Sequence, residues 1–277
     1  MSLAKIPLAG VIGSPIAHSK SPQIHGHWLK TLGLKGAFIP LHVEPEDLRQ
    51  VLEAMPKMGF IGANVTIPHK EAVIEIADII TDRAAMIGAV NTITFRADGK
   101  IQGDNTDGYG FIENLKAGAP DWVPGDGPAC VFGAGGAARA VISSLLDAGV
   151  PEILLANRTR VRAERLRSVF GNRVTVYDWS QAGTMVSHAG LVVNTTSLGM
   201  IGKPELRVPL DGLRADTVVT DLVYAPLKTT LLATAEAAGC VTVDGLGMLL
   251  HQAVPGFERW FGARPTVDHE TRLAALR

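Results

Sequence analysis

A glycine-rich turn near the middle of the chain constrains the fold more than any other feature of the sequence. The apolar run Ala129–Phe132, typical of a buried strand, leads into Gly133-Ala134-Gly135-Gly136-Ala137, and an amphipathic helical pattern then continues to Ala148. Glycines in a strand, turn and helix of this kind let backbone N–H groups and a helix N-terminus approach a pyrophosphate closely. The pattern therefore predicts a dinucleotide-binding domain with a doubly wound parallel sheet.

The next predicted strand indicates which dinucleotide binds. It ends in Asn157-Arg158-Thr159, Arg162 follows, and no carboxylate occurs before Glu164. Domains that bind NAD usually place Asp or Glu here, on the ribose 2′-hydroxyl. A carboxylate would repel a 2′-phosphate, whereas a guanidinium group binds it with paired hydrogen bonds. The sequence therefore predicts NADP as the cofactor.

The late position of the glycine turn requires a second domain. A chain of 277 residues with 47% hydrophobic content can form two cores, and strand-like and helical patterns alternate along its whole length. We expect an α/β fold with an N-terminal α/β substrate domain (1–107 and 247–277) and a Rossmann NADP-binding domain (108–246). The apolar helix at 248–260, interrupted by Pro255, is expected to return to the first domain.

The two domains are expected to differ in their elements. In the first, strands are predicted at 8–12, 37–43, 59–65 and 90–95, and helices at 22–32, 45–55 and 69–79. In the second, six strands are predicted near residues 129, 153, 174, 191, 218 and 241.

Composition excludes several classes of partner. The net charge is −1, aromatic residues make up 5%, and there is no long basic run, so neither nucleic acid nor a membrane is expected as a partner. Cys130 and Cys240 stand alone in apolar segments, which predicts buried thiols in a reducing compartment such as the cytoplasm. His25, His27 and His69 lack a third neighbouring ligand, so no metal is expected.

Four polar segments of the first domain are expected to follow strands. They are His18–Pro22, Asn64–Lys70, Ala89–Thr92 and Gly103–Gly108. Strand ends in an open parallel sheet converge on a crevice, and the hydroxyls, amides, ammonium and carboxylate gathered there suit a small hydroxylated anion. Each segment alone also fits a helix cap, but four of them ahead of a dinucleotide domain favour a binding site.

Lys70 and Asp107 carry the predicted chemistry. Hydride delivery to a ketone develops negative charge on the oxygen, which a positioned ammonium stabilises and protonates. Lys70 is the candidate for this role, with Asp107 beside it, and a solvated surface lysine is the alternative interpretation.

The chain resembles the shikimate dehydrogenase family over almost its full length. The matching segments are Gly13–Pro22, Asn64–Lys70, Ala89–Thr92, Asn105–Gly108, Gly133–Ala137, Asn157–Thr159, Asn194–Ser197 and Asp244–Leu249. The resemblance implies NADPH-dependent reduction of 3-dehydroshikimate to shikimate, in chorismate and aromatic amino acid biosynthesis. His25-Gly26-His27 is a small departure, because many relatives carry His-Asn there.

The resemblance also implies roles for individual residues. Lys70 and Asp107 would form the catalytic pair. Ser19 and Ser21 would hold the substrate carboxylate, with Tyr224 close to it. The ring hydroxyls would be bound by Asn64, Thr66, Asn91, Asp107 and Gln252. NADP would be held by Gly133, Ala134, Gly135, Gly136, Ala137, Asn157, Arg158, Thr159 and Arg162, with Thr195, Met200, Gly245 and Met248 near the nicotinamide side.

Two other functions stay open from the sequence. One is a quinate/shikimate dehydrogenase that prefers NAD, against which Arg158 argues. The other is a non-catalytic NADP-binding regulator, which would not need Lys70 and Asp107 together. A homodimer is also left open.

Overall fold

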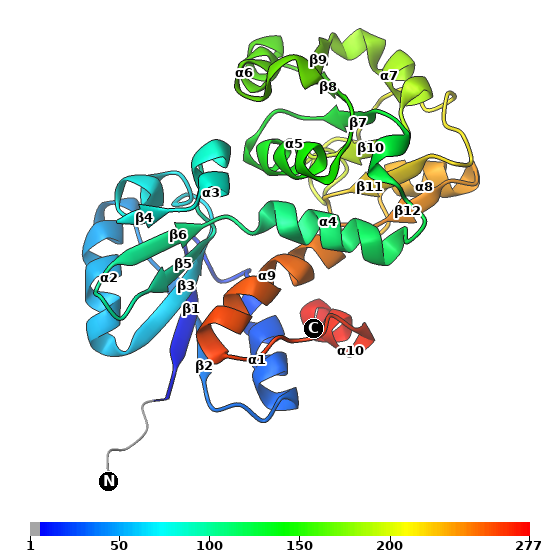
Figure 1. Ribbon diagram of the computed structural model, residues 1–277. Coiled ribbons are helices and arrows are strands. Elements are labelled where there is room, and N and C mark those ends of the chain that lie inside the picture. The colour runs from blue at the N-terminus through cyan, green and yellow to red at the C-terminus, as the bar shows by residue number, and fades with distance from the viewer. Residues whose placement is uncertain (1–5) are drawn as a thin grey trace. The chain divides into compact units, whose positions relative to one another are not determined.

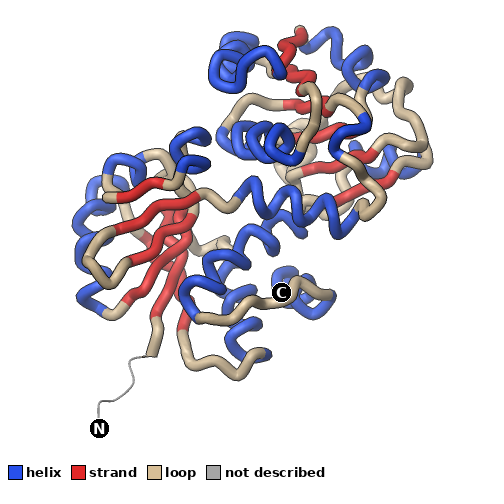
Figure 2. The backbone as a smooth tube through the Cα atoms, in the orientation of Figure 1, coloured by secondary structure: helices blue, strands red, loops and turns tan. Residues whose placement is uncertain are grey.

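Two separate six-stranded sheets organise the computed structural model, which describes residues 6–277 (Figures 1 and 2). The chain divides into one unit formed by residues up to Thr106 with Gln252–Arg277 and another formed by Asp107–His251. The domain boundaries expected from the sequence, 107/108 and 246/247, lie one and five residues from these junctions. As limits of independent domains they stay a prediction.

The first unit contains a mixed sheet with the strand order β2-β1-β3-β5-β6-β4. Its strands are β1 (Leu8–Gly13), β2 (Ala37–His42), β3 (Phe60–Val65), β4 (Ile79–Ile80), β5 (Thr92–Phe95) and β6 (Ile101–Asp104). Its helices are α1 (Ser21–Thr31), α2 (Leu48–Ala54), α3 (Asp82–Ile87), α10 (His269–Leu276) and the second part of α9 (Leu246–Phe261). Strand β5 runs antiparallel to both β3 and β6, whereas β1 is parallel to β2 and β3.

Successive side chains of β1 pack on opposite faces of this sheet, as the strand period of two requires. Ile12 joins the cluster that contains Leu48 and Leu52 of α2, whereas Val11 joins Phe38 and Trp260 of α9. Gly62 in β3 leaves room for that tryptophan, since a Cβ atom there would lie 2.0 Å from Trp260 Nε1. The indole N–H then donates to the carbonyl of Ile93 at 3.1 Å, and α9 thus returns to the first unit as predicted.

The second unit contains an all-parallel sheet with the order β12-β11-β10-β7-β8-β9. Its strands are β7 (Ala129–Phe132), β8 (Ile153–Ala156), β9 (Val174–Tyr177), β10 (Leu191–Asn194), β11 (Val218–Asp221) and β12 (Val241–Val243). Its helices are α4 (Asp107–Gly118), α5 (Gly136–Ala148), α6 (Arg160–Phe170), α7 (Ala182–His188), α8 (Thr230–Ala237) and the first part of α9. The six predicted strands and the doubly wound order are confirmed.

Helices cover both faces of the parallel sheet (Figure 1). Val131 of β7 packs with residues of α4, α5 and α6, whereas its neighbours Cys130 and Phe132 pack with residues of α7 and α8. Cys130 and Cys240 are buried free thiols, as predicted, and burial raises the pKa of both. None of the helices in residues 6–277 is both long and apolar enough to span a membrane.

Two expectations about helices are wrong. No α-helix forms at 69–79, where turns, a 3-10 segment (Ala72–Glu75) and β4 replace it. Backbone groups there bond to neighbouring segments instead: Lys70 O accepts from Val90 N at 2.7 Å, and Asp78 N donates to Ile101 O at 2.9 Å. Pro255 does not interrupt α9, which continues to Phe261. The proline removes only one backbone hydrogen bond of the helix, and the packing of Trp260 and Phe261 in the next turn compensates for that loss.

Candidate functional site

The carboxyl edge of the mixed sheet gathers the predicted polar segments, for a reason that differs from the expected one. The segment Ala89–Thr92 does not follow a strand but leads into β5, whose first residue is Thr92. Because β5 is antiparallel, its start lies beside the end of β3, where Val65 N donates to Asn91 O at 2.8 Å. Asn91 N in turn donates to Asp104 O, at the end of β6, at 3.0 Å. The antiparallel strand therefore brings its polar start to the same edge as the ends of its neighbours.

Asn91 is the centre of a buried hydrogen-bond network at this edge. Its Oδ1 atom accepts from Thr106 N at 2.9 Å and from Thr92 Oγ1 at 2.9 Å. Its Nδ2 atom donates to Gln252 Oε1 at 3.4 Å, and Thr106 Oγ1 donates to Gln252 O at 2.8 Å. The structure thus brings together Asn91 and Gln252, which the sequence had predicted. Thr106 was missed, because its role depends on a residue 146 positions away.

Backbone bonds on both sides fix the segment that carries Lys70. Thr66 N donates to Ile12 O at 2.9 Å, and the buried His69 places Nε2 2.7 Å from Val43 O. His69 therefore has a structural role in attaching this segment to the end of β2. Lys70, next in sequence, is half-buried at the same edge without the helix that was expected around it.

Ser19 and Ser21 lie at the start of α1. Ser21 is the first residue of the helix and is buried, and its backbone N–H donates to Ser19 Oγ at 3.3 Å. Pro22 occupies the first turn, where the lack of an N–H group costs nothing. The helix-start interpretation of this segment is therefore correct, and it does not conflict with a binding role for hydroxyls at a helix N-terminus.

His25 and Asn64 are both buried and lie close to each other. His25 is fully buried and stacks on Phe38 with 3.8 Å between ring centroids. Within residues 6–277, neither ring nitrogen of His25 nor Oδ1 of Asn64 has a hydrogen-bond partner of normal geometry. Burial lowers the pKa of His25 to about 3, and the nearby Asn64 side chain offsets a small part of that shift. His25 is therefore neutral in the folded protein at neutral pH.

Asp104 anchors the end of β6 through two arginines. Its carboxylate accepts from Arg83 Nε at 2.6 Å, Arg259 Nη2 at 2.6 Å and Thr81 Oγ1 at 2.8 Å. Burial alone would raise the pKa of Asp104, but these charged and neutral donors outweigh it and lower that pKa. The pairing fixes the strand just before Asn105, and no sequence pattern predicts it, because Arg259 is 155 residues away.

In the second unit, the glycine turn borders a cavity of about 900 Å³. Gly133 has a φ of +110°, and a Cβ atom there would lie 2.5 Å from Thr195 Oγ1, so only glycine fits. Asn157 accepts from Ala134 N at 3.2 Å and donates to Thr159 O at 2.8 Å, which links the turn to the end of β8. The predicted residues that line the cavity are Gly133, Ala134, Gly135, Asn157, Arg158, Arg162 and Thr195. The sequence had not predicted its other lining residues, Trp179, Thr196, Ser197, Leu198, Pro204, Glu205 and Arg207.

A smaller hollow of about 310 Å³ gathers four predicted residues, one of which, Thr195, also lines the larger cavity. They are Ala137, Thr195, Met200 and Tyr224. The buried Asp221 holds its rim, because it accepts from Asn194 Nδ2 at 2.9 Å, Val223 N at 2.9 Å and Thr229 Oγ1 at 2.8 Å. Burial raises the pKa of Asp221, and these bonds offset part of that shift.

Three other predicted residues lie outside this hollow. Gly245 approaches the chain closely, since a Cβ atom there would lie 2.4 Å from Leu222 O. Met248 packs against the core of the second unit. Asp107 is the first residue of α4 and of the second unit, so its pairing with Lys70 of the first unit stays a prediction.

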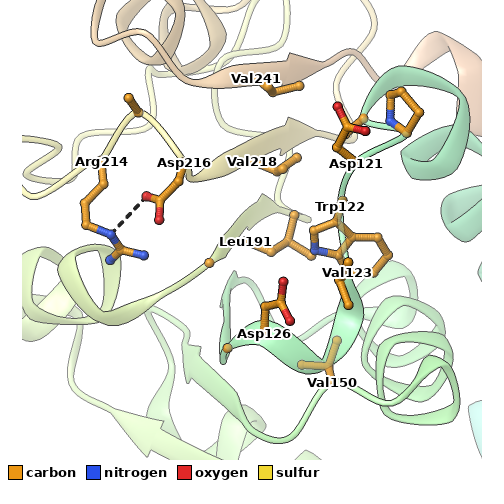
Figure 3. Close-up of a pocket in the computed structure, with 15 residues that line it drawn as sticks. Asp121, Trp122, Val123, Asp126, Val150, Leu191, Arg214, Asp216, Val218 and Val241 are labelled. Carbon is orange, nitrogen blue, oxygen red and sulfur yellow. Dashed lines mark hydrogen bonds and ion pairs between the residues drawn. The ribbon is translucent and has the colours of Figure 1, made fainter.

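A further pocket of about 410 Å³ lies at the opposite, amino edge of the parallel sheet (Figure 3). The first residues of three strands, Leu191, Val218 and Val241, line it, together with Trp122. The Arg214–Asp216 ion pair at 3.1 Å lies at its margin. None of the predicted site residues lines this pocket.

Comparison with known proteins decides the family. Three family models match: the shikimate dehydrogenase substrate binding domain at residues 11–93, shikimate / quinate 5-dehydrogenase at 125–202, and the shikimate 5′-dehydrogenase C-terminal domain at 245–269. The NADP(+) shikimate dehydrogenase of Cereibacter sphaeroides is 69% identical over 274 residues, which cover 99% of this chain and 98% of that protein. The chain belongs to the shikimate dehydrogenase family.

Solved structures of shikimate dehydrogenases have the same fold. Shikimate 5-dehydrogenase from Thermus thermophilus, in complex with NADP(H) and shikimate, is 38% identical with a TM-score of 0.85 and covers 98% of each chain. Quinate dehydrogenase from Corynebacterium glutamicum, in complex with NAD, is 32% identical with a TM-score of 0.89 and covers 97% of this chain and 98% of that one. The fold alone therefore does not determine whether NADP or NAD binds. The residues that line the cavity determine this preference.

Proposed function

We propose that this chain is an enzyme, an oxidoreductase that interconverts 3-dehydroshikimate and shikimate with NADP, in chorismate and aromatic amino acid biosynthesis. The observation that carries this function is the cavity in which the glycine turn meets Arg158 and Arg162. Neither arginine side chain has a carboxylate within ion-pair distance among residues 6–277, so both are available to an anion brought by a ligand.

The residues around the cavity fit NADP. A Cβ atom at Gly135 or Gly136 would meet only open space, so the turn leaves room for a pyrophosphate there, and α5 begins at Gly136. Asn157, Arg158, Thr159 and Arg162 would hold the adenosine part with its 2′-phosphate. Thr195, Met200, Gly245 and Met248 would lie toward the nicotinamide. When bound, NADPH supplies the hydride.

The substrate would be held by groups that differ in chemistry. The hydroxyls of Ser19 and Ser21 would bind the carboxylate, with Tyr224 close to it. Asn64, Thr66, Asn91, Asp107 and Gln252 would bind the ring hydroxyls. The network around Asn91 supports this role, because its fixed amides and hydroxyls need no reorganisation to receive a ligand.

Lys70 would act as the acid in reduction. Its ammonium group Nζ stabilises the negative charge that develops on the carbonyl oxygen and transfers a proton to that oxygen. In the reverse direction, the neutral amine of Lys70 accepts the proton of the substrate hydroxyl. Asp107 would orient the ammonium group and accept a hydrogen bond from a ring hydroxyl.

Initial rates with shikimate and with quinate, each against NADP and NAD, test the function. We expect shikimate with NADP to give the highest kcat/KM. A preference for NAD and quinate would support the second candidate, which the likeness to the Corynebacterium glutamicum enzyme suggests. Absence of turnover with every pair, in a protein that still binds NADP, would favour a non-catalytic regulator.

We also infer that the enzyme works in the cytoplasm, and whether it forms a homodimer stays open. The two buried free thiols are consistent with a reducing compartment. Light scattering on the purified protein tests the oligomeric state, and fractionation of cells that express it tests the location.

A further inference from the structure

The cavity beside the glycine turn carries more positive charge than the sequence motif accounts for. Its charged lining residues are Arg158, Arg162, Arg207 and Glu205, so three positive charges and one negative charge leave a net charge of +2. A phosphate monoester carries a charge of about −1.5 to −2 at neutral pH. The cavity therefore matches the charge of a 2′-phosphate only when Arg207 is counted.

Other arginines close to the motif already have partners. Arg160 pairs with Glu164 at 3.1 Å and with Asp178 at 2.7 Å, and Arg167 lies 3.7 Å from Glu164. Arg207, in contrast, makes no ion pair or side-chain hydrogen bond with any residue in the part of the chain that the structure describes. Its guanidinium group is therefore free to bind an anion in the cavity.

The backbone at Arg207 is held in place by its neighbours. Leu206 is buried in the core that α7 and α8 cover, and Val208 packs against the same core. Pro204 O accepts from Gly199 N at 2.8 Å, which closes the loop after β10. Arg207 thus lies between two anchored residues, which lowers the entropic cost of holding it against a ligand.

We propose that Arg207 is a specificity-determining residue that binds the 2′-phosphate of NADP from the loop after β10, together with Arg158 from the loop after β8 and Arg162 from the first turn of α6. This inference rests on the proposed function, since it needs NADP as the cofactor. Guanidinium groups from two separate loops surround a phosphate more completely than groups from one segment, and each adds charge-assisted hydrogen bonds that NAD cannot accept.

The test measures dissociation constants of NADP and NAD for the full-length protein by calorimetry, with 2′,5′-ADP and 5′-AMP as smaller probes. Arg207→Ala should raise the dissociation constants of NADP and 2′,5′-ADP about tenfold and leave those of NAD and 5′-AMP nearly unchanged. Arg207→Lys should restore part of the loss, because it keeps the charge. Arg160→Ala is the matched control, because the Arg160 guanidinium group is paired with Glu164 and Asp178. This variant should change the dissociation constant of neither NADP nor NAD.

Two results would overturn the assignment. Equal weakening of NADP and NAD by Arg207→Ala would place the side chain on a part common to both, and unchanged binding of both would place it outside the site. Arg158→Ala separates this inference from the proposed function. If Arg158→Ala abolishes the preference for NADP and Arg207→Ala does not, only the role of Arg207 fails. If the unmodified protein binds NAD as tightly as NADP, the proposed cofactor itself fails.

Discussion

The two sheets of this protein differ in strand direction, and the difference shows how each forms its polar edge. In the parallel sheet every strand points the same way, so the turn at Gly133 and the loops after Ala156 and Asn194 meet at one edge by topology alone. In the mixed sheet the reversed β5 brings the residue just before its start, Asn91, to an edge made otherwise of strand ends. A single antiparallel strand thus places an amide among segments that are far apart in sequence.

The difference also separates two kinds of polar group. Around the parallel sheet, the cavity offers backbone N–H groups and unpaired guanidinium groups, which bind an anion by charge. At the edge of the mixed sheet, amides and hydroxyls already bond to one another, as Asn91 does with Thr106 and Gln252. Variants in the two units should therefore affect different steps of the reaction.

Lys70→Ala should have the largest effect and should alter only the chemical step. Removal of the ammonium group leaves the developing oxyanion without its acid, so kcat should fall about a hundredfold or more while KM for shikimate changes little. Steady-state kinetics, with NADP binding measured to verify folding, is the check. Lys57→Ala removes an exposed lysine of the same unit and should behave like the unmodified enzyme.

A partner variant sharpens this result. Asp107→Ala should reduce kcat and raise KM for shikimate. In the double variant with Lys70→Ala, the loss of transition-state stabilisation should be smaller than the sum of the losses in the two single variants, because the groups act together. A folded Lys70→Ala protein with nearly normal turnover would show that another group is the acid.

Arg158→Ala should have the second largest effect, confined to the cofactor. Loss of charge-assisted hydrogen bonds to the 2′-phosphate should weaken NADP about tenfold to a hundredfold and leave NAD nearly unchanged. Fluorescence titration with both cofactors measures this. An equal loss of affinity for NADP and NAD would mean that Arg158 does not bind the 2′-phosphate. The proposed difference between the two units would then be weaker.

Ser19→Ala and Ser21→Ala should each raise KM for shikimate by about tenfold with little change in kcat, because a carboxylate is bound alike in the ground state and the transition state. Initial rates over a range of shikimate concentrations give both constants. If the double variant keeps its affinity for shikimate, the carboxylate must be bound elsewhere.

The last expected effect concerns stability rather than activity, and it originates in the first unit. Burial lowers the pKa of His25 from 6.5 to about 3, so its contribution to stability is complete above pH 6.5 and is lost as the pH falls toward 3. The free energy of unfolding should fall by up to about 1.4 kcal/mol per pH unit across this window because of His25 alone.

Urea unfolding at pH 7, 6 and 5 tests this dependence. His25→Gln should flatten it, whereas the exposed His18→Gln should leave it unchanged. Parallel curves for His25→Gln and the unmodified protein would mean that the folded state accepts a proton at His25 without cost.

Sequence reasoning succeeded where the physical signal is local. The turn at Gly133 needs a residue with positive φ and no side chain, and buried parallel strands are short apolar runs, so the second sheet could be predicted strand by strand. The helix predicted after Pro68 was wrong because the deciding interactions there are not local. Its helical pattern was outweighed by backbone bonds to Val90 and Ile101, which only the folded sheet provides.

Contacts between distant residues could not be predicted either. Asp104 is held by Arg83 and Arg259, and one of these comes from near the end of the chain. The direction of β5 depends on pairing with β3 and β6, which no local pattern encodes. Arg207 follows no motif, and only the cavity shows where it lies.

The inclusion of Gln252–Arg277 in the first unit has a consequence for the order in which the protein can fold during synthesis. The ribosome makes the strands of the first sheet before those of the second, but Trp260, which packs against Val11 and Phe38, is made after both. All of Asp107–His251 has been made before that residue appears, so the second unit can complete its core while the first waits. Although its strands precede those of the second unit, the first unit can complete its core only after the second unit has been made.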